Sequence, residues 1–247
     1  MRSEDIFLSL IIPVYNEEIR LDKPLVHVAE YLQANFPHWE ILYVDDGSTD
    51  NTYQKLQMIQ RTQNHVRAVH YANNRGKGHA VREGLRSAEG NILLFSDADF
   101  SAPIEEMQKL LAFIVGGYDV AIGSRGLPDS NVEVHQSWAR ETMGKMGNLL
   151  IRALLPIDLS DTQCGFKMFR KEAVVKILPK LKINGFAFDI EILAIAQVIG
   201  LRIAEVPVTW RNVPESKVHT IHSLHVLQDL LTIRYRLAMG EYTQTKD

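Results

Sequence analysis

Hydrophobic and polar positions alternate along the first half of this chain in blocks that predict strands and helices in turn. Residues 7–14 form a nearly continuous apolar run, which is typical of a parallel strand buried on both faces. Residues 24–35 follow with helical spacing, and Pro24 suits a first helical turn. The pattern then repeats, with strands expected over 39–44, 65–72, 91–99 and 119–123 and helices expected over 50–61, 77–88 and 103–115. This alternation predicts an α/β fold with a mostly parallel central sheet flanked by helices.

The second half of the chain is less regular. We expect a loop over residues 126–134 and a long amphipathic helix over 137–155. Short strands are expected at 165–169 and 202–207, with helices over 186–199 and 222–239. Because no repeat, low-complexity segment or long linker interrupts the sequence, we expect one main domain over residues 1–220, followed by a C-terminal amphipathic helix and tail over 221–247.

Composition narrows the class of protein. The chain has 247 residues, of which 46% are hydrophobic and 23% are charged, as expected for a globular protein. The net charge of −3 argues against a general nucleic-acid binder. The single cysteine, Cys164, excludes an internal disulfide framework and fits a reducing compartment. The acidic start does not resemble a signal peptide, and no apolar run approaches the roughly 18 residues of a membrane span. We therefore expect a cytoplasmic protein that is soluble or bound to a membrane surface.

The most informative polar residues are Asp97 and Asp99, at the end of an apolar strand. Strand side chains alternate between faces, so the two carboxylates are expected on the same side. Two like charges about 4 Å apart repel by several kcal/mol at an effective dielectric near 20, so the pair favours a cation. Carboxylate oxygens suit a hard ion such as Mg²⁺ or Mn²⁺. The alternative is a turn in which one aspartate caps the helix that begins near Pro103.

Polar residues also follow the first two strands. Ligands of open parallel sheets lie outside the carboxyl ends of the strands. Asp45 or Asp46 could accept hydrogen bonds from a ribose or a base, while Tyr15 offers a ring for stacking. The alternative is that residues 48–50 only cap the next helix, which leaves both aspartates unexplained.

The third strand is followed by Asn73-Asn74-Arg75-Gly76-Lys77-Gly78, directly before a helix. Glycines, basic side chains and a helix N-terminus together favour an anion such as phosphate, although a plain turn explains this segment equally well. Next to the carboxylate pair, the segment indicates a nucleotide diphosphate bridged by a metal ion.

Taken together, these motifs resemble the family 2 inverting glycosyltransferases of the GT-A fold. The resemblance rests on Val14–Glu18, Asp45–Asp50, Arg75–Gly78, Asp97–Asp99 and Gly123–Arg125. Two further segments, Asp161–Lys167 and Phe186–Glu191, look most like the dolichyl-phosphate glucosyltransferase branch. Glu205–Val208 and Glu215–Lys217 are shared more widely with polyprenyl-phosphate glycosyltransferases, including the mannosyl enzymes.

The resemblance implies a metal-dependent inverting hexosyltransferase that moves glucose from UDP-glucose onto a polyprenyl phosphate, dolichyl or undecaprenyl. Its nucleotide-sugar half would be residues 1–125, and its acceptor half residues 126–220. The resemblance assigns Asp97 and Asp99 to Mg²⁺ or Mn²⁺ and the following residues to the donor: Pro13, Tyr15, Glu17, Asp45, Asp46, Lys77, Asp97, Ala98 and Asp99. It assigns the acceptor phosphate to Arg125, Arg140, Ser216 and Lys217. Arginine suits that task because its planar fork binds phosphate oxygens in pairs.

The implied acceptor sets the mechanism. A phosphate monoester has a second pKa near 6 and is largely dianionic at neutral pH, so it can attack the anomeric carbon without a dedicated base. Asp189 is the base that an enzyme with a hydroxyl acceptor would use; here we expect it to orient the sugar or the acceptor. Transfer of mannose from GDP-mannose and transfer to a hydroxyl acceptor remain the alternatives.

Two departures from the family pattern matter. Many mannosyl relatives have a glutamine as a further metal ligand where this chain has Ser101, which weakens the mannosyl interpretation. The N-terminal membrane anchor of related glucosyl enzymes is not seen in this sequence. Peripheral membrane contact would then use surface helices at 137–155 and 222–239, which could equally pack on the core or on a second subunit.

Two other classes of protein are less compatible with the sequence. A nucleotidyltransferase would carry a glycine-rich basic signature near residues 13–17, which is absent, and a non-catalytic module would be expected to lack Asp97 and Asp99. The three histidines at 219, 222 and 225 are expected to be solvated or to face lipid headgroups instead of binding a metal. Cys164 is expected to be a small core residue beneath the acceptor site.

Overall fold

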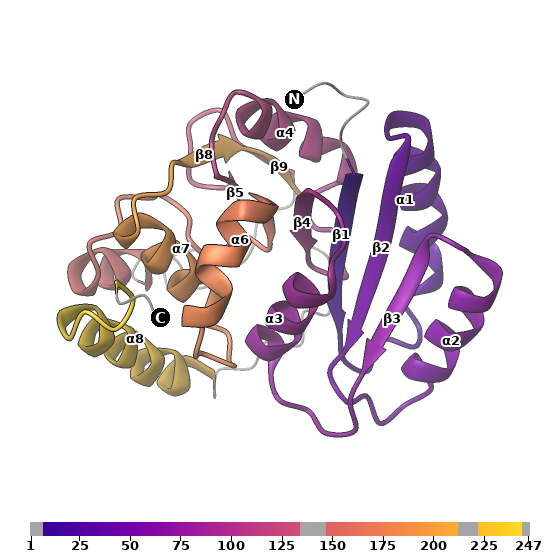
Figure 1. Ribbon diagram of the computed structural model, residues 1–247, viewed down its shortest axis with the longest axis horizontal. Helices are drawn as coiled ribbons and strands as arrows, with labels where there is room; N and C mark the ends of the chain where they lie inside the picture. Colours follow the sequence, from indigo (N-terminus) through magenta and orange to yellow (C-terminus); the bar gives the residue numbers. More distant parts are fainter. Residues whose placement is uncertain (1–6, 134–146, 212–221, 244–247) are drawn as a thin grey trace.

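The computed structural model describes residues 7–133, 147–211 and 222–243 and contains a seven-stranded central sheet (Figure 1). In the first half, strands and helices alternate as the hydrophobic pattern predicts. The strands there are β1 (Phe7–Val14), β2 (His38–Asp45), β3 (Val66–His70), β4 (Ile92–Ser96) and β5 (Val120–Ser124). The helices there are α1 (Asp22–Asn35), α2 (Thr52–Thr62), α3 (Lys77–Ser87), the 3-10 turn η2 (Ile104–Glu106) and α4 (Met107–Val115).

The second half contributes the strands β6 (Asn131–Val132), β7 (Phe166–Arg170), β8 (Ile203–Pro207) and β9 (Thr209–Trp210). Its helical elements are α6 (Lys171–Ile177), the 3-10 turn η3 (Leu178–Lys180), α7 (Phe188–Val198) and α8 (His222–Ala238). Residues 147–154 are also helical, in agreement with the C-terminal part of the helix expected over 137–155; residues 137–146 lie outside the described ranges.

The central sheet has the order β3-β2-β1-β4-β7-β5-β8. Its strands run parallel except β7, which is antiparallel to both neighbours, β4 and β5. The carboxyl ends of β1 to β5 therefore lie at one edge of the sheet. This confirms the predicted mostly parallel α/β architecture.

Helices cover both faces of the sheet, so the strands are buried on both sides. One apolar core joins alternate residues such as Ile11 and Val44 to α3, α6 and α7, and α8 packs outside α7 (Figure 1). The other core joins Leu8, Leu10 and Ile12 to α1 and α4. This explains why β1 is a continuous apolar run, because every second side chain faces a different core.

Several local features differ from the predictions. Residues 126–134, expected to be a loop, contain β6, which pairs in parallel with β9 as a separate two-stranded sheet. The helical elements α6 and η3, between β7 and α7, were not predicted. None of the helices in the described ranges is both long and apolar enough to cross a membrane.

Candidate active site

Polar side chains gather where the parallel strands end. Asp45 ends β2, Asp97 follows β4 directly, and Arg125 follows β5. Lys77 begins α3 after the loop from β3 and reaches the same edge. The structure therefore brings together side chains that the sequence places on different strands, as the rule for open parallel sheets predicts.

Asp97 and Lys77 form an ion pair at the centre of this edge. The Lys77 Nζ lies 2.6 Å from Asp97 Oδ1, and both side chains are about three-quarters buried. Burial would lower the pKa of Lys77, but the carboxylates of Asp97 and Asp189 outweigh this effect and raise the pKa above its ordinary value. Lys77 is therefore a charged group beside the carboxylate pair.

The segment that carries Asp97 and Asp99 is tightly constrained. The Phe100 N–H donates to Asp97 O (3.1 Å), the Ser101 N–H donates to Asp99 Oδ1 (3.0 Å), and Phe100 has a φ of 46°. Left-handed backbone is uncommon for a bulky residue and costs about 1–3 kcal/mol where the surroundings enforce it. Across the sheet, a Cβ atom at Gly165 would lie 2.1 Å from Asp97 Oδ2. Only glycine leaves room for this carboxylate.

Asp45 and Asp46 have structural partners that the sequence did not reveal. Asp45 accepts hydrogen bonds from the Ser48 backbone N–H (3.2 Å) and from the Ser48 hydroxyl, and its other oxygen lies 2.8 Å from His70 Nδ1. Asp46 accepts from the backbone N–H groups of residues 75 and 76 and from the Tyr71 hydroxyl. Both carboxylates are almost completely buried, so they fix the loops at this edge, and their role toward a donor stays a prediction.

The start of α3 is not the open phosphate cradle that the sequence suggested. The N–H groups of Gly78 and His79 donate to the Asn184 carbonyl, at 2.8 and 3.2 Å, and those of residues 75 and 76 donate to Asp46. These four backbone donors are therefore engaged within the protein. The charged groups that this segment offers toward an anion are the exposed Arg75 side chain and the Lys77 side chain, which is paired with Asp97.

Asp189, in the first turn of α7, belongs to a second buried ion pair. Its Oδ1 lies 2.6 Å from Nζ of Lys167, a fully buried residue of β7 that also donates to the Cys164 carbonyl. Burial raises the pKa of Asp189, while Lys167 and Lys77 oppose this shift. Lys167 ends the motif Asp161–Lys167, but its pairing with Asp189 was not predicted, because nothing in a short strand marks its lysine as internal.

Arg125 makes a bidentate contact with Asp161. Its Nε and Nη2 donate to the two carboxylate oxygens at 2.6 and 2.9 Å, and its guanidinium lies 4.8 Å from the centroid of the Trp210 ring. Asp161 sits within a motif that we had singled out, but its individual role was not predicted. Arg140, Ser216 and Lys217, the other residues expected at the acceptor phosphate, lie outside the described ranges.

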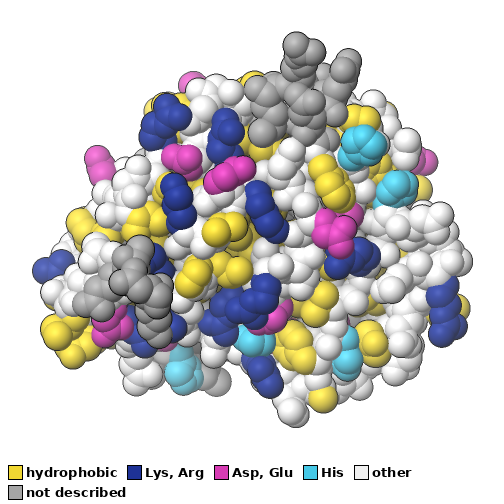
Figure 2. All heavy atoms as spheres, in the orientation of Figure 1, with side chains coloured by type: hydrophobic (Ala, Val, Ile, Leu, Met, Phe, Trp, Pro, Cys, Tyr) yellow, Lys and Arg dark blue, Asp and Glu magenta, His cyan; other side chains and the backbone are white. Residues whose placement is uncertain are grey.

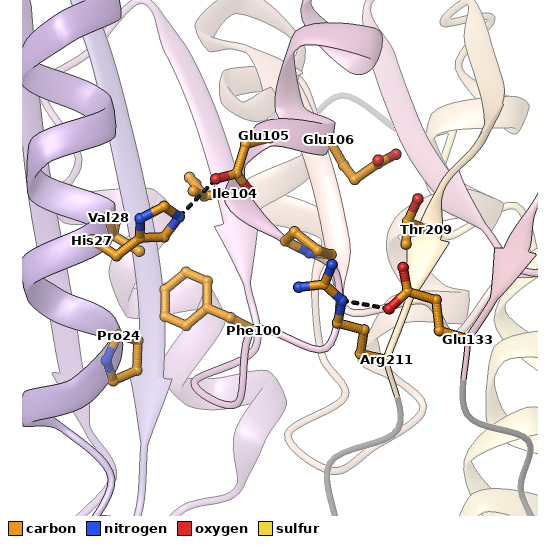
Figure 3. A pocket seen from close by; sticks show the side chains of 11 residues that line it. Pro24, His27, Val28, Phe100, Ile104, Glu105, Glu106, Glu133, Thr209 and Arg211 are labelled. Atoms are coloured by element: carbon orange, nitrogen blue, oxygen red, sulfur yellow. Dashed lines mark hydrogen bonds and ion pairs between the residues drawn. The ribbon is translucent and has the colours of Figure 1, made fainter.

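Two hollows share Phe100, the residue that follows Asp99, although neither is lined by Asp97 or Asp99. The smaller is lined by Glu17 and Ala98, two of the predicted donor residues, together with Tyr43 and Phe100. The larger, of about 540 Å³, lies between α1, η2 and the strand β9. Figure 3 shows the Phe100 ring inside it, with the His27–Glu105 pair (2.6 Å) on one side and the Arg211–Glu133 pair (2.7 Å) on the other.

Two other predicted donor residues lie at the end of β1. Pro13 is buried, whereas Tyr15 is 40% exposed, which leaves its ring available for stacking. Cys164 is fully buried, as expected, and burial raises the pKa of its thiol to about 12. It is therefore not a reactive thiolate at neutral pH.

The residues present fit a hard divalent cation, such as Mg²⁺ or Mn²⁺, that is bound by only some of its ligands from the protein. Asp97 and Asp99 supply carboxylate oxygens, and Lys77 already supplies a positive charge to Asp97. Among the described residues no group of three His, Cys, Asp or Glu side chains converges on one point. At phosphates, Mg²⁺ usually takes several of its ligands from substrate oxygens and water.

Comparison with solved structures defines the fold. Glucosyl-3-phosphoglycerate synthase from Mycobacterium tuberculosis, solved with Mn²⁺, UDP-glucose and phosphoglyceric acid, superimposes with a TM-score of 0.70, covering 93% of this chain and 80% of that one at 19% identity. Mannosyl-3-phosphoglycerate synthase from Rubrobacter xylanophilus gives 0.69, covering 98% and 77% at 17% identity. The fold is the GT-A fold of glycosyltransferases.

Sequence comparison then identifies the family. The model of glycosyl transferase family 2 matches residues 9–178, so the chain belongs to this family and is a glycosyltransferase. The dolichyl-phosphate beta-glucosyltransferase of Saccharomyces cerevisiae is 36% identical over 98% of this chain and 78% of its own length. The human protein of the same name is 33% identical, over 95% and 77%. The resemblance predicted from the motifs is confirmed.

Proposed function

We propose that this enzyme transfers glucose from a nucleotide donor, with UDP-glucose favoured, to the phosphate of a polyprenyl lipid. The observation that carries the proposal is the similarity of nearly the whole chain to proteins named as dolichyl-phosphate beta-glucosyltransferases. The UDP-glucose bound to a structural relative at 19% identity supports the choice of donor. Within the same fold, transfer of mannose from GDP-mannose remains the second candidate.

The proposed reaction is one inverting displacement. An oxygen of the lipid phosphate forms a bond to the anomeric carbon as the bond from that carbon to the UDP oxygen breaks, and the electron pair leaves with UDP. An α-linked donor thus gives a β-linked lipid-phosphate sugar. Because the attacking phosphate is largely dianionic at neutral pH, no proton has to be removed from it. The enzyme has to align two anionic groups and offset their repulsion.

The surroundings of Asp189 favour a phosphate acceptor over a hydroxyl acceptor. A hydroxyl needs a carboxylate that is free to take its proton. Asp189 Oδ1 is instead paired with Nζ of the fully buried Lys167 at 2.6 Å, and the positive charge of Lys77 also acts on Asp189. We therefore assign Asp189 to orienting the bound sugar or acceptor.

We assign the donor to the edge formed by β1, β2 and β4. Asp97 and Asp99 would hold Mg²⁺ or Mn²⁺, Lys77 would face the diphosphate, and Tyr15 and Glu17 would line the nucleoside pocket. When bound, the cation supplies positive charge that stabilises the leaving diphosphate. The Mn²⁺ in the structural relative supports a divalent ion without choosing between the two metals.

We also propose peripheral contact with the cytoplasmic face of a membrane, made by α8 and by the helical residues 147–154. α8 packs on the core through Leu230 and Ile233, yet a second apolar stripe faces outward. The stripe consists of Leu227, Leu231 and Tyr235 of α8 and of Met239, which directly follows the helix. Figure 2 shows hydrophobic side chains on the surface over α8. Leu149 and Leu150 are exposed on the neighbouring helical segment. Such apolar faces suit the boundary of a lipid layer.

A transfer assay tests the proposed function directly. Purified protein is incubated with Mg²⁺ or Mn²⁺, polyprenyl phosphate and radiolabelled UDP-glucose, and the organic phase is counted. A parallel reaction contains labelled GDP-mannose. We expect extractable label from UDP-glucose only. Label from GDP-mannose alone would change the donor, and no label from either, with active controls, would contradict the proposal.

A further inference from the structure

The geometry around Arg125 indicates a use for one side of its guanidinium. Nε and Nη2 donate to Asp161 at 2.6 and 2.9 Å, and the Arg125 main-chain N–H donates to the same carboxylate at 3.1 Å. A guanidinium has five N–H donors arranged as a fork. Asp161 uses the Nε–Nη2 edge, so three N–H donors remain, two on Nη1 and one on Nη2. Within the ranges that the structure describes, this second edge meets no acceptor.

Asp161 is itself held in place by hydrogen bonds to residues other than Arg125. The Glu205 carboxylate, on β8, accepts the backbone N–H of Asp161 (2.8 Å) and of Ser160 (2.9 Å). The Asp161 side chain also accepts the Gln163 N–H at 3.2 Å and is almost completely buried. The arginine is therefore tied to a carboxylate that is itself anchored to the central sheet.

A third group holds the guanidinium from its flat side. The Trp210 ring, on β9, lies 4.8 Å from the guanidinium carbon. A cation over an aromatic face is attracted electrostatically and is kept in one plane. Because Asp161 fixes one edge and Trp210 fixes one face, the second edge of Arg125 has a defined direction.

Arg125 lies at the same edge of the sheet as the carboxylate pair, because it follows β5 as Asp97 follows β4. Asp97 is among the charges that act on Arg125, and one third of the arginine side chain is exposed at the end of β5. A buried ion pair made only for stability gains little over apolar packing. Arg125 is instead partly exposed, is held by a carboxylate and a ring, and has a free edge near Asp97 and Asp99. Such an arginine is suited to binding an oxyanion through two parallel hydrogen bonds.

We propose that Asp161, Glu205 and Trp210 are positioning residues that aim the free Nη1–Nη2 edge of Arg125 at the phosphate of the acceptor. This inference rests on the proposed function, in which the acceptor is a phosphate monoester. It goes beyond that function by naming the three residues that hold Arg125 in the orientation in which it binds the phosphate.

The test compares binding of two ligands to matched variants. Binding of a short-chain isoprenyl phosphate, in the presence of UDP and Mg²⁺, and of UDP alone is measured by calorimetry on the full chain. Asp161→Asn keeps the shape but turns an amide toward the arginine. Asp158→Asn, in the same loop, is the control, because Asp158 is fully exposed and meets Arg152 only at 3.4 Å. Trp210→Leu removes the ring, and Trp210→Phe restores an aromatic face.

We expect Asp161→Asn to weaken binding of the isoprenyl phosphate roughly tenfold or more, the loss typical of one misdirected charge-assisted contact. UDP binding should stay within about twofold of wild type, and Asp158→Asn should bind both ligands normally. Trp210→Leu should give the same selective loss, and Trp210→Phe should recover most of it. A role in stability alone would lower the melting temperature without this difference between ligands. The Trp210 pair decides the question if Asp161→Asn does not fold.

The outcomes separate this inference from the proposed function. Unchanged isoprenyl phosphate binding in Asp161→Asn and Trp210→Leu, or a loss confined to UDP, would overturn the positioning role even if wild-type protein glucosylates the lipid. Absence of isoprenyl phosphate binding by the wild type would overturn it as well. If the wild type binds the isoprenyl phosphate and the variants lose it, but no glucose is transferred, the positioning role stands and the proposed function fails.

Discussion

Four charged side chains alternate in sign beneath the edge of the sheet. Lys77 pairs with Asp97, Lys167 pairs with Asp189, and the charges of Lys77 and Asp97 both act on Asp189. Burying one such charge without its partner costs several kcal/mol. Each lysine therefore places a positive charge 2.6 Å from a carboxylate that is largely or fully buried at the site.

Replacing the carboxylates of Asp97 and Asp99 tests their proposed role as metal ligands. Asp97→Asn and Asp99→Asn are expected to reduce transfer at least about a hundredfold, because removing one preorganised electrostatic group at a reacting centre has effects of this size. Mn²⁺ binding followed by electron paramagnetic resonance should weaken in both variants, while circular dichroism stays unchanged. Normal Mn²⁺ binding by either variant would contradict its assignment as a ligand.

The Lys167–Asp189 pair gives a prediction about stability. Lys167→Met alone is expected to lower the free energy of unfolding by about 3–5 kcal/mol, because it leaves the Asp189 carboxylate buried without its partner. The double variant Lys167→Met, Asp189→Leu should recover part of this loss. Urea unfolding of the wild type, both single variants and the double variant forms a complete cycle. Additive losses would show that the two side chains do not interact.

The lowered pKa of Asp161 predicts how the stability of the folded protein changes at acid pH. Burial would raise its pKa, but the hydrogen bond and charge of Arg125 outweigh burial and hold the pKa below the ordinary value of 3.8. A lowered folded-state pKa adds stability that is fully present above pH 3.8 and is lost as the pH falls through the folded-state value. Asp161→Asn should therefore be less stable than wild type at pH 7, and the difference should shrink below pH 3.8. Urea unfolding across this range measures it; a constant difference would contradict the shift.

At the scale of single elements, the sequence predicts β1 to β5 and their helices well, because long apolar runs and helical spacing are local signals. It predicts β7 as a strand but not its place between β4 and β5 or its antiparallel direction, which depend on residues far away in the chain. The same limit applies to the site. Asp97 and Asp99 stand out after a local apolar run, but β4 ends at Ser96 and Asp99 lies in a turn, so the strand alternation expected over 91–99 does not reach them. The Lys167 partner of Asp189 lies 22 residues away in sequence and gives no local signal.

The start of β7 also offers a precise test of the site. Gly165→Ala would place a Cβ atom 2.1 Å from Asp97 Oδ2, so the carboxylate must move. We expect this variant to lose Mn²⁺ binding and transfer while keeping its fold. Gly147→Ala is the matched control, because a Cβ atom there has no neighbour within 4 Å among the described residues. Full activity of Gly165→Ala would show that the position of Asp97 is not critical.

At the scale of the whole molecule, the helix α8, which carries the apolar stripe, lies on the opposite side from α2 (Figure 1). The stripe includes no acidic side chain, since Asp229, the one acidic residue of α8, lies beside Gly185. This pattern suits a helix that lies on lipid headgroups. The same stripe could also contact a second copy of the chain. Lipid binding and self-association predict different effects of a charge placed in the stripe.

Vesicle flotation distinguishes them. Leu231→Glu introduces a charge in the middle of the stripe and is expected to reduce binding to vesicles containing anionic lipid by about fivefold or more. Met58→Glu, on α2, changes an apolar residue that is even more exposed than Leu231 but lies away from the stripe, and it should bind as wild type. Sedimentation of both variants without lipid reports on self-association. If Leu231→Glu binds vesicles normally but changes the oligomeric state, the stripe is a subunit contact.

The position of β7 also has a consequence for how the chain is made. β4 and β5 leave the ribosome early, but they cannot pair with each other, because β7 lies between them and is translated later. Until residue 170 has emerged, the nascent protein carries two strands with open edges, which are the surfaces most prone to mispairing. Completion of the sheet is thus a late, long-range event, since β8, the other neighbour of β5, is translated later still.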